Sequence, residues 1–542
     1  MNTPEDGVNF FVVLLVALPL YFLGLGNIDL FFQDDEWLYV KIAAEMFDRG
    51  ELWIPYWLGE PAYYKPPLAY WLMMPFFWLG GDRIMLARIS VALTAVGTLA
   101  LTYFLGKELY GKREAACASL LAAVSYGFLA FGRVGVMDMQ LTFFLAASLL
   151  LFLRAMRRKS PVYAGLYFVV IGLSNLIKGP VVPLIIVTIS FIILLFTRGW
   201  KPFFSRFAFA GMVVGGFIAF SWPLALYFKG EFPAWYAFFI VGENAGKFTD
   251  AMGYPALPFV ATLLKWALPW SLLILVAPLV LAAKATPGRL DFMLPVVWMA
   301  TVIGIHLIPA VRLPWYTFPA LPAALLLVGA ASVRYPGNPV LVWTYRLTGV
   351  LLALAAALVS VTPSLFPLLS PPFFWLGSAA LCFWAAAFFT FRRDVPKLAV
   401  ALGLAVLLLN PGVSAMTDPK FPAEAQSILA ASSRPTAVVR IRTGRLSQEH
   451  ALYSFRLDRK IEQTHGEEAT LRFVREKSGN LIVSDTDYKM LLAASPSLGA
   501  ETRIAASWSR WRDSIPTDTI VKAIQEGDRT LLLEPYHIVQ KR

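Results

Sequence analysis

Carboxylate side chains interrupt long apolar stretches of this sequence at a few separated points. Asp34, Asp35 and Glu36 follow the first apolar stretch, and Asp138 opens a later one. An ionisable residue at a membrane boundary costs free energy, so each of these acids requires a reason for its position. A carboxylate there can take the proton from a hydroxyl group, which then becomes a nucleophile.

Cationic side chains interrupt the apolar stretches in the same way. Lys65 precedes Pro66-Pro67, Lys178 lies in a Lys-Gly-Pro turn, Lys247 follows Glu243-Asn244, and Arg312 precedes Tyr316 at a later junction. Fixed cations stabilise the charge that develops on a departing phosphate. Carboxylates and cations on one membrane face therefore indicate a site for an anionic lipid headgroup at which a proton is also removed.

Each of these residues also has a purely structural interpretation. Asp138 could cap a helix, because a carboxylate at a helix N-terminus accepts amide hydrogen bonds and complements the dipole. Lys178 could extend its ammonium group to the membrane surface. Pro66-Pro67 could only stiffen a loop, and Tyr316 could belong to an interfacial aromatic belt. Independent placement would not gather acids and bases on one face, so their grouping favours a shared site.

The elements that position these residues are membrane helices. Hydrophobic residues make up 58% and charged residues 15% of the 542 residues, and the mean hydropathy is +0.62. A soluble globular protein could not cover so much apolar surface. The net charge of +12 arises mainly from basic residues beside apolar stretches, which suits membrane topology rather than nucleic-acid binding. Cys117 and Cys382 lie in apolar stretches and are expected to be buried thiols.

Hydropathy predicts a polytopic α-helical membrane protein with about 13 transmembrane helices. The predicted spans are 9–26, 86–106, 114–131, 136–154, 162–177, 181–197, 207–228, 262–283, 292–308, 314–333, 345–366, 372–390 and 398–412. With a cytoplasmic N-terminus, the inner loops carry 17 Lys and Arg residues and the four short outer loops carry three. This bias predicts that the acidic and basic site residues face the outside.

Two long outer loops and a polar C-terminal region complete the predicted organisation. Residues 27–85 and 229–261 are rich in aromatic residues and suited to lie along the membrane surface. We expect residues 1–415 to form a transmembrane domain whose site these two loops build. Short β-rich stretches alternate with helical ones after Pro411, so residues 416–542 are expected to form a small extracytoplasmic α/β domain.

The motifs together resemble one enzyme family, the C-type membrane glycosyltransferases. The resemblance is strongest to the branch containing the lipid A aminoarabinose transferases and the protein O-mannosyltransferases. It covers about residues 10–325 and rests on motifs that follow in order: Asp34-Asp35-Glu36, Tyr64-Lys65-Pro66-Pro67-Leu68-Ala69-Tyr70-Trp71, Gly132-Arg133 with Asp138, Lys178-Gly179-Pro180, Glu243-Asn244 with Lys247, and Leu313-Pro314 with Tyr316.

The resemblance implies a polyprenyl (undecaprenyl) phosphate sugar as donor and a hydroxyl of a lipid A-like lipid, a glycan or a protein as acceptor. It implies a multi-pass protein of the bacterial inner membrane that works at the outer face and needs no nucleic acid. The residues that it implicates fall into three groups. The catalytic acids are Asp35, as the base, with Asp138 and Glu36; the phosphate ligands are Lys65, Lys178, Lys247, Arg312 and Tyr316; and the acceptor or loop residues are Glu243, Asn244 and Tyr64.

Two departures from the family pattern concern the sugar. Tyr64 stands where the aminoarabinose transferases usually have an acidic residue, and Lys247 stands where they usually have arginine. Lysine neutralises a phosphate as a point charge, without the bidentate fork of arginine. Phosphate binding is therefore expected to persist, whereas aminoarabinose is not fixed as the sugar.

Two alternatives stay open at this point. Two carboxylates suit Mg²⁺ or Mn²⁺, so a divalent cation shared by Asp35 and Asp138 is one of them, although the chemistry does not require a cofactor. The second is a transporter or flippase for lipid-linked sugars, with the acids as proton relays. Transporters usually place such groups near the midplane and show internal repeats, whereas this sequence gathers them at one face, which favours an enzyme.

Overall fold

The computed structural model of the chain describes residues 10–26, 35–249, 253–284, 290–365, 373–416, 423–440, 461–511 and 533–541. The chain divides into two compact units. The first covers residues 1–56, 61–359 and 377–410, and the second covers residues 57–60, 360–376 and 411–542.

The first unit is a bundle of apolar helices. Each of the 13 predicted spans overlaps one helix or one pair of helices in the described residues. The single helices are α1 (Phe10–Phe22), α4 (Arg83–Leu109), α7 (Asp138–Arg157), α8 (Pro161–Lys178), α9 (Val181–Thr197), α10 (Arg206–Phe228), α14 (Leu290–Leu307), α15 (Leu321–Arg334), α16 (Pro339–Leu365), α17 (Phe373–Arg392) and α18 (Val395–Met416).

Two predicted spans are broken into bent pairs. Helices α5 (Lys112–Ala123) and α6 (Tyr126–Gly132) meet at 64°, and α12 (Ala256–Trp266) and α13 (Ser271–Ala282) meet at 97°. Pro269 lies in the second break, where its missing N–H cannot continue a helix. Eight of the described helical segments are long and apolar enough to cross a membrane, or ten if each bent pair counts as one span. The predicted number of 13 therefore stays a prediction.

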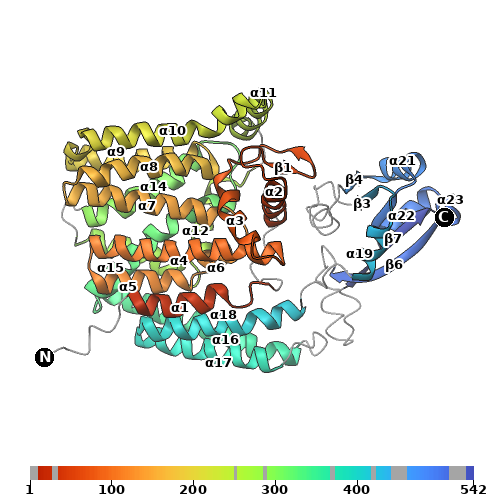
Figure 1. Cartoon of the computed structure of the whole chain (residues 1–542). Coiled ribbons are helices and arrows are strands. Elements are labelled where there is room, and N and C mark those ends of the chain that lie inside the picture. Colours follow the sequence, from red (N-terminus) through yellow and green to blue (C-terminus); the bar gives the residue numbers. More distant parts are fainter. Residues whose placement is uncertain are drawn as a thin grey trace. The chain divides into compact units, whose positions relative to one another are not determined.

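Close helix packing in the bundle depends on small residues. Helices α4, α7, α8, α9 and α10 run side by side in Figure 1. Gly172 of α8 faces Gly215 of α10 so closely that a Cβ at Gly172 would lie 2.2 Å from the Gly215 carbonyl oxygen. Such contacts between backbones are typical of membrane helix interfaces. The hydrophobic effect does not drive helices together in lipid, so close packing at small residues stabilises the interface instead.

The two predicted outer loops contain shorter elements. The first loop contains α2 (Asp35–Arg49), the two-stranded sheet of β1 (Tyr56–Trp57) and β2 (Glu60–Pro61), and α3 (Leu68–Phe77). Helix α3 packs against α2, α4 and α8. The second loop contains α11 (Phe232–Trp235), a π-helix η3 (Tyr236–Ala245) and a 3₁₀ turn η4 (Gly246–Phe248), and a further 3₁₀ segment, η5 (Pro314–Ala320), precedes α15.

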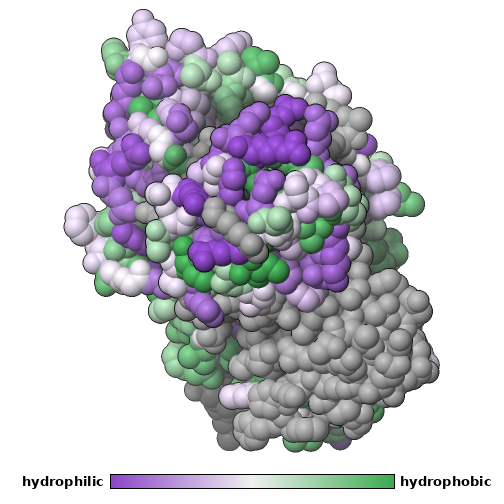
Figure 2. Space-filling view, turned by 90° about the vertical axis from the view of Figure 1, so that its right-hand side faces the viewer, coloured by the Kyte–Doolittle hydropathy of each residue, from purple (hydrophilic) through white to green (hydrophobic). Residues whose placement is uncertain are grey.

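The hydropathy of the exposed side chains differs from one part of the surface to another. Large apolar side chains such as Phe196, Phe217 and Phe220 are exposed on α9 and α10, as expected for helices that contact lipid. Figure 2 shows the face on the right-hand side of Figure 1, where hydrophilic residues cover much of the coloured surface.

The second unit contains a five-stranded mixed sheet with strand order β4-β3-β5-β7-β6. The strands are β3 (Thr436–Arg440), β4 (Glu462–His465), β5 (Asn480–Ser484), β6 (Thr502–Trp511) and β7 (Leu533–Lys541). Strand β3 pairs in parallel with β4 and β5, whereas β7 runs antiparallel to β5 and β6.

Helices cover both faces of this sheet. Leu481 and Val483 of β5 pack in one cluster with α21 (Glu467–Lys477) and α22 (Asp485–Ala494), and Ile482 packs in the other with α19 (Ala423–Ala431). A short helix, α23 (Ser497–Glu501), precedes β6. This unit contains both strands and helices, whereas the predicted α/β domain at 416–542 and its boundary stay a prediction.

Candidate active site

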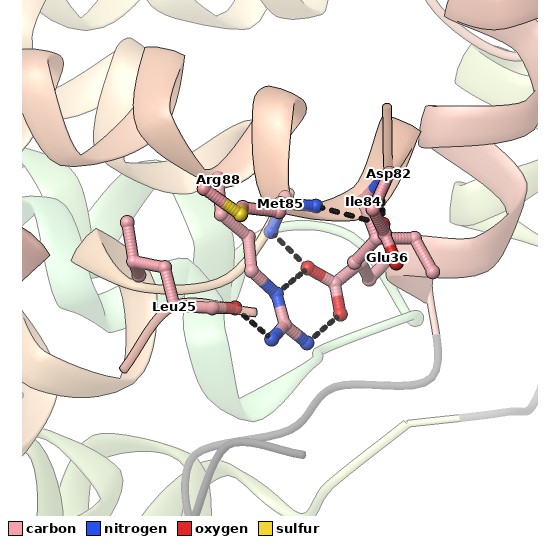
Figure 3. Close-up of polar contacts among 7 residues, drawn as sticks. Leu25, Glu36, Asp82, Ile84, Met85 and Arg88 are labelled. Carbon is pink, nitrogen blue, oxygen red and sulfur yellow. Dashed lines mark hydrogen bonds and ion pairs between the residues drawn. The ribbon is translucent and has the colours of Figure 1, made fainter. Parts of the chain in front are cut away.

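A buried carboxylate fixes the beginning of α2. Glu36 is fully buried and accepts two hydrogen bonds from the Arg88 guanidinium of α4, with N–O distances of 2.7 and 2.6 Å (Figure 3). The Gly135 amide donates to the same carboxylate at 2.7 Å, and Arg88 also donates to the Leu25 carbonyl at 2.8 Å. Arginine is suited to such bidentate pairing. This geometry favours a positioning role for Glu36 rather than its predicted catalytic role, because its carboxylate is sealed by protein donors.

The Glu36–Arg88 clamp joins the two segments that carry the predicted catalytic acids. Asp35 precedes Glu36 directly and begins α2, and Gly135 lies three residues before Asp138, which begins α7. Asp34 lies outside the described residues. Burial raises the pKa of the Tyr39 phenol well above its usual value, and the Asp35, Asp138 and Glu243 carboxylates raise it further. The acids of three separate segments therefore act on one buried phenol.

The Lys-Gly-Pro turn brings Lys178 to Asp138. Gly179 has φ of +81°, and a Cβ there would lie 2.8 Å from the Phe239 ring, so glycine is required by both conformation and space. The turn ends α8 at Lys178 and starts α9 after Pro180. The Lys178 ammonium group lies 2.7 Å from Asp138 Oδ1 and 5.3 Å from the ring centroid of Tyr316. The structure thus joins a predicted acid with two predicted phosphate ligands.

The second group of cations centres on Glu243 of the π-helix η3. Lys65 Nζ lies 2.8 Å and Lys247 Nζ lies 3.5 Å from the same oxygen, Glu243 Oε2. Burial alone would raise the pKa of Glu243, but the two ammonium groups hold it below its usual value. Burial, together with repulsion from Lys65, lowers the pKa of Lys247 to about 8, against the opposing attraction of Glu243. Lys247 is therefore poised to exchange a proton near neutral pH.

These residues line a cavity of about 660 Å³, which we call the lysine cavity. Its polar wall is formed by Lys65, Asp138, Lys178, Glu243, Asn244, Lys247, His306 and Tyr316. Apolar residues, including Leu141, Leu184 and Ile308, form the remainder of the wall. A cavity of this size with a few convergent charges can hold the headgroup of a lipid-linked substrate.

Besides Glu36, three predicted site residues lie outside the wall of the lysine cavity. The Arg312 guanidinium donates to the carbonyl oxygens of Tyr254, Leu307 and Pro309 at 2.9, 3.2 and 2.9 Å, so it holds loop backbone together. Tyr64 packs edge-on against Phe238, with ring centroids 5.1 Å apart, and Asp35 is the first residue of α2. The geometry favours a structural role for Arg312, and its contact with phosphate stays a prediction.

His306 is a cavity residue that the sequence analysis did not identify. Its buried ring lies 4.9 Å from the Tyr316 ring, and its Nδ1 lies 2.8 Å from the Val302 carbonyl oxygen. If the ring is neutral and Nδ1 carries the proton, Nε2 is left as an acceptor. The available signal was an ionisable residue inside the predicted span 292–308, since such residues are functional candidates by default. Arg88, in the span 86–106, carried the same signal.

A metal site was left open by the sequence, and the structure offers few ligands for one. Within the described residues, no group of three or more His, Cys, Asp and Glu side chains is arranged to hold a metal ion. Asp138 is engaged by Lys178, which competes with a cation for the same oxygen. A divalent cation shared by Asp35 and Asp138 stays an untested prediction.

Comparisons with known proteins agree with this geometry. Residues 64–225 match the family model described as dolichyl-phosphate-mannose-protein mannosyltransferase. An undecaprenyl phosphate-alpha-4-amino-4-deoxy-L-arabinose arabinosyl transferase of Pseudomonas fluorescens is 26% identical over 333 residues, which cover 60% of this chain and 56% of the relative. The corresponding transferase of Yersinia pestis is 25% identical over 431 residues, or 74% of each chain.

A solved structure extends the similarity to the whole fold. The crystal structure of ArnT from Cupriavidus metallidurans bound to undecaprenyl phosphate superposes with a TM-score of 0.67 and covers 97% of both chains at 19% sequence identity. The resemblance inferred from the sequence motifs is confirmed by these matches.

Proposed function

We propose that this chain, a C-type membrane glycosyltransferase of the aminoarabinose transferase and protein O-mannosyltransferase type, transfers a sugar from a polyprenyl phosphate to a hydroxyl acceptor. It is a multi-pass protein of the bacterial inner membrane. Undecaprenyl phosphate is the proposed lipid carrier, because the arabinosyl transferases that resemble the chain are named for that donor. The proposed acceptors are a lipid A-like lipid, a glycan and a protein.

The single observation that supports this proposal most strongly is the lysine cavity. Three lysines from separate segments converge there beside the Asp138 carboxylate, and the rest of the wall is apolar. A phosphate has a net negative charge that Lys65, Lys178 and Lys247 can neutralise, and an isoprenoid chain requires apolar surface. Both needs of a polyprenyl phosphate sugar are met at one place.

The proposed reaction is a displacement at the anomeric carbon of the sugar. The acceptor hydroxyl oxygen bonds to this carbon, and its proton passes to the Asp35 carboxylate. The bond between the anomeric carbon and the phosphate oxygen breaks, and the electron pair leaves with the polyprenyl phosphate. The lysines stabilise the second negative charge that forms on that phosphate. Asp138, held by Lys178, is placed to orient the acceptor or the sugar.

The reaction is expected to take place at the outer face of the membrane. The predicted outer loops, 27–85 and 229–261, supply Asp35, Lys65, Glu243 and Lys247, and the excess of basic residues lies in the predicted inner loops. We therefore infer a cytoplasmic N-terminus and an extracytoplasmic domain at 416–542. The test uses a variant in which both natural cysteines are replaced by alanine, in cells whose outer membrane has been permeabilised. A cysteine introduced at Glu468 should then react with an impermeant maleimide, and one introduced at Lys201 should not.

Transfer by the purified full chain in detergent tests the proposed activity. Undecaprenyl phosphate sugars are incubated with lipid A, glycan and protein acceptors, and mass spectrometry follows the released undecaprenyl phosphate and the glycosylated product. Asp35→Asn should lower the rate by about 10²–10⁴-fold, as loss of a catalytic base does, while donor binding persists. Asp48→Asn, a change at the exposed end of the same helix, is the matched control and should keep the native rate.

A native rate in Asp35→Asn would show that another group is the base. No transfer by the wild-type chain with any donor and acceptor, combined with movement of the donor across a vesicle membrane, would identify a lipid-linked sugar flippase instead. An enzyme needs no vesicle, whereas a flippase has no chemistry to perform in detergent.

A further inference from the structure

A second cavity lies at the other end of α15 from the lysine cavity. Tyr316 lies in η5, directly before the N-terminus of α15, whereas Ser332 and Val333 near its C-terminus line a cavity of about 670 Å³. The 14 residues of α15 span about 21 Å at about 1.5 Å per residue. The two cavities are therefore separate sites at opposite ends of the bundle.

Three arginines from two distant parts of the chain line this second cavity, which we call the arginine cavity. Arg113 comes from the N-terminal turn of α5, Arg392 ends α17, and Arg393 lies in the turn between α17 and α18. The Asp394 carboxylate also lines the cavity, but its Oδ2 lies 3.0 Å from Lys397 Nζ. The charge of Asp394 is thereby offset, and the cavity keeps an excess of positive charge.

Three other arginines of the predicted inner loops are paired with carboxylates. Arg154 and Arg158 contact Glu108 at 3.1 and 2.8 Å, and Arg334 contacts Glu114 and Asp291 at 3.4 and 3.0 Å. Within the described part of the chain, neither Arg392 nor Arg393 forms an ion pair.

Arg392 and Arg393 contact uncharged groups instead. Arg393 donates to the Pro336 carbonyl, and Arg392 lies 5.5 Å from the centroid of the Phe388 ring. Each guanidinium has five N–H donors, so donors remain for an anion.

The remainder of the arginine cavity is suited to hydrocarbon. Its wall includes Cys117, Leu120, Leu341 and Val395, and the hydroxyl groups of Ser332 and Tyr345 lie 2.8 Å apart and satisfy each other. A nucleotide or a sugar phosphate would need further polar partners for its base or hydroxyl groups. Arginine forks above an apolar wall instead match an amphiphile with a phosphate at one end.

We propose that the arginine cavity binds an anionic phospholipid, with the headgroup phosphate against Arg113, Arg392 and Arg393 and an acyl chain along the apolar wall. Basic pockets between membrane helices bind anionic headgroups in this way. This site is distinct from the donor site of the proposed transfer reaction, because the two cavities lie at opposite ends of α15.

Native mass spectrometry of the delipidated full chain tests this site. Phosphatidylglycerol should bind, phosphatidylcholine should not, and the double variant Arg392→Gln/Arg393→Gln should lose about tenfold or more in phosphatidylglycerol affinity, because two charge-assisted contacts are removed. Arg206→Gln is the matched control: it removes an arginine at a helix end, predicted to face the same side, that does not line the cavity. Phosphatidylglycerol affinity in this control should equal that of the wild type.

Three outcomes would overturn the proposal. Equal loss in the Arg206→Gln control would show that any basic helix end attracts the lipid. Unchanged affinity in the double variant, with an unchanged thermal transition in detergent, would show that the cavity is not the site. Displacement of the lipid by excess inorganic phosphate, or equal binding of glycerophosphoglycerol without acyl chains, would identify a soluble anion as the ligand.

Discussion

Two ion-pair systems at the same end of the bundle are built differently. The Glu36–Arg88 clamp is closed: its side chains are 0% and 4% exposed, and protein donors or acceptors surround both. The Lys65–Glu243–Lys247 group is open: its side chains are 13%, 27% and 31% exposed, and all three line the lysine cavity. One system uses the arginine fork, and the other uses lysine point charges.

The closed pair is suited to hold segments of the chain in place, and the open group is suited to exchange its carboxylate for a ligand. A bidentate buried pair with all its partners satisfied fixes the segments that carry Asp35 and Asp138. A carboxylate shared between two partly exposed lysines can give up its place to a ligand of the same charge. We expect Glu243 to leave Lys65 and Lys247 when the donor phosphate enters, because phosphate offers them more negative charge.

The largest effect is expected from breaking the clamp. Glu36→Gln leaves the buried Arg88 guanidinium without a counter-charge, and loss of one partner of a buried pair costs about 3–5 kcal/mol in unfolding free energy. The thermal transition of the purified chain in detergent should fall markedly. At temperatures where the variant remains folded, kcat should fall more than donor affinity, because the clamp positions the acids and does not touch the phosphate.

Asp48→Asn is the matched control for the clamp. Asp48 and Arg83 join the same two helices, α2 and α4, through a surface pair of 2.8 Å whose carboxylate is 60% exposed. An exposed pair contributes about 0–1 kcal/mol, so this variant should keep the native transition. Equal losses in Glu36→Gln and Asp48→Asn would contradict the assignment of the holding role to the buried clamp.

A smaller effect is expected at the lysine cavity. Lys65→Gln removes one charge-assisted contact to the donor phosphate, which contributes about 1.5–3 kcal/mol, equivalent to about 10- to 150-fold in Kd. Lys229→Gln changes a lysine of the second outer loop that pairs with Glu51 and does not line the cavity, so its affinity should stay native. Isothermal titration with undecaprenyl phosphate measures both; equal affinities in the two variants would remove Lys65 from the phosphate site.

The smallest effect is a dependence of donor affinity on pH. Lys247 has a pKa of about 8, so its charge is present below this pH and is lost as the pH rises through it. Undecaprenyl phosphate affinity should therefore be highest near pH 7, where the phosphate monoester has already passed its second pKa of about 6, and should fall as the pH rises through about 8. Bound phosphate raises the pKa of Lys247, so proton uptake should accompany binding.

Lys247→Arg separates this cause from other titrations. Arginine stays charged throughout this range, so the variant should bind undecaprenyl phosphate with an affinity that does not fall above pH 8. A decline of the same size in the wild type and in Lys247→Arg would assign the pH dependence to another group.

Much of the fold was predictable because apolar length and basic loop residues encode membrane helices directly. Every predicted span overlaps a helix of the described residues, and short β-rich stretches after Pro411 indicated strands. The breaks in α5–α6 and α12–α13 were not predicted, because hydropathy averages over a bend. A straight span and a bent pair of helices can have the same composition, because a bend changes only the direction of the backbone.

Part of the site was predictable because its charges interrupt apolar stretches. Lys65, Asp138, Lys178, Glu243, Lys247 and Tyr316 all line one cavity, as their grouping on one face indicated. The roles were less predictable. Glu36 and Arg312 carry the same charges as cavity residues, and only the positions of their partners reveal that one holds helices and the other holds loop carbonyls.

A cryo-electron microscopy structure of the full chain with undecaprenyl phosphate tests the central claim most directly. We predict that the phosphate lies between Lys65 and Lys247, within hydrogen-bond distance of both ammonium groups, that Glu243 has moved beyond ion-pair distance of Lys65, and that the Glu36–Arg88 clamp is unchanged. A phosphate bound outside the lysine cavity, with Glu243 still joining the two lysines, would contradict the account.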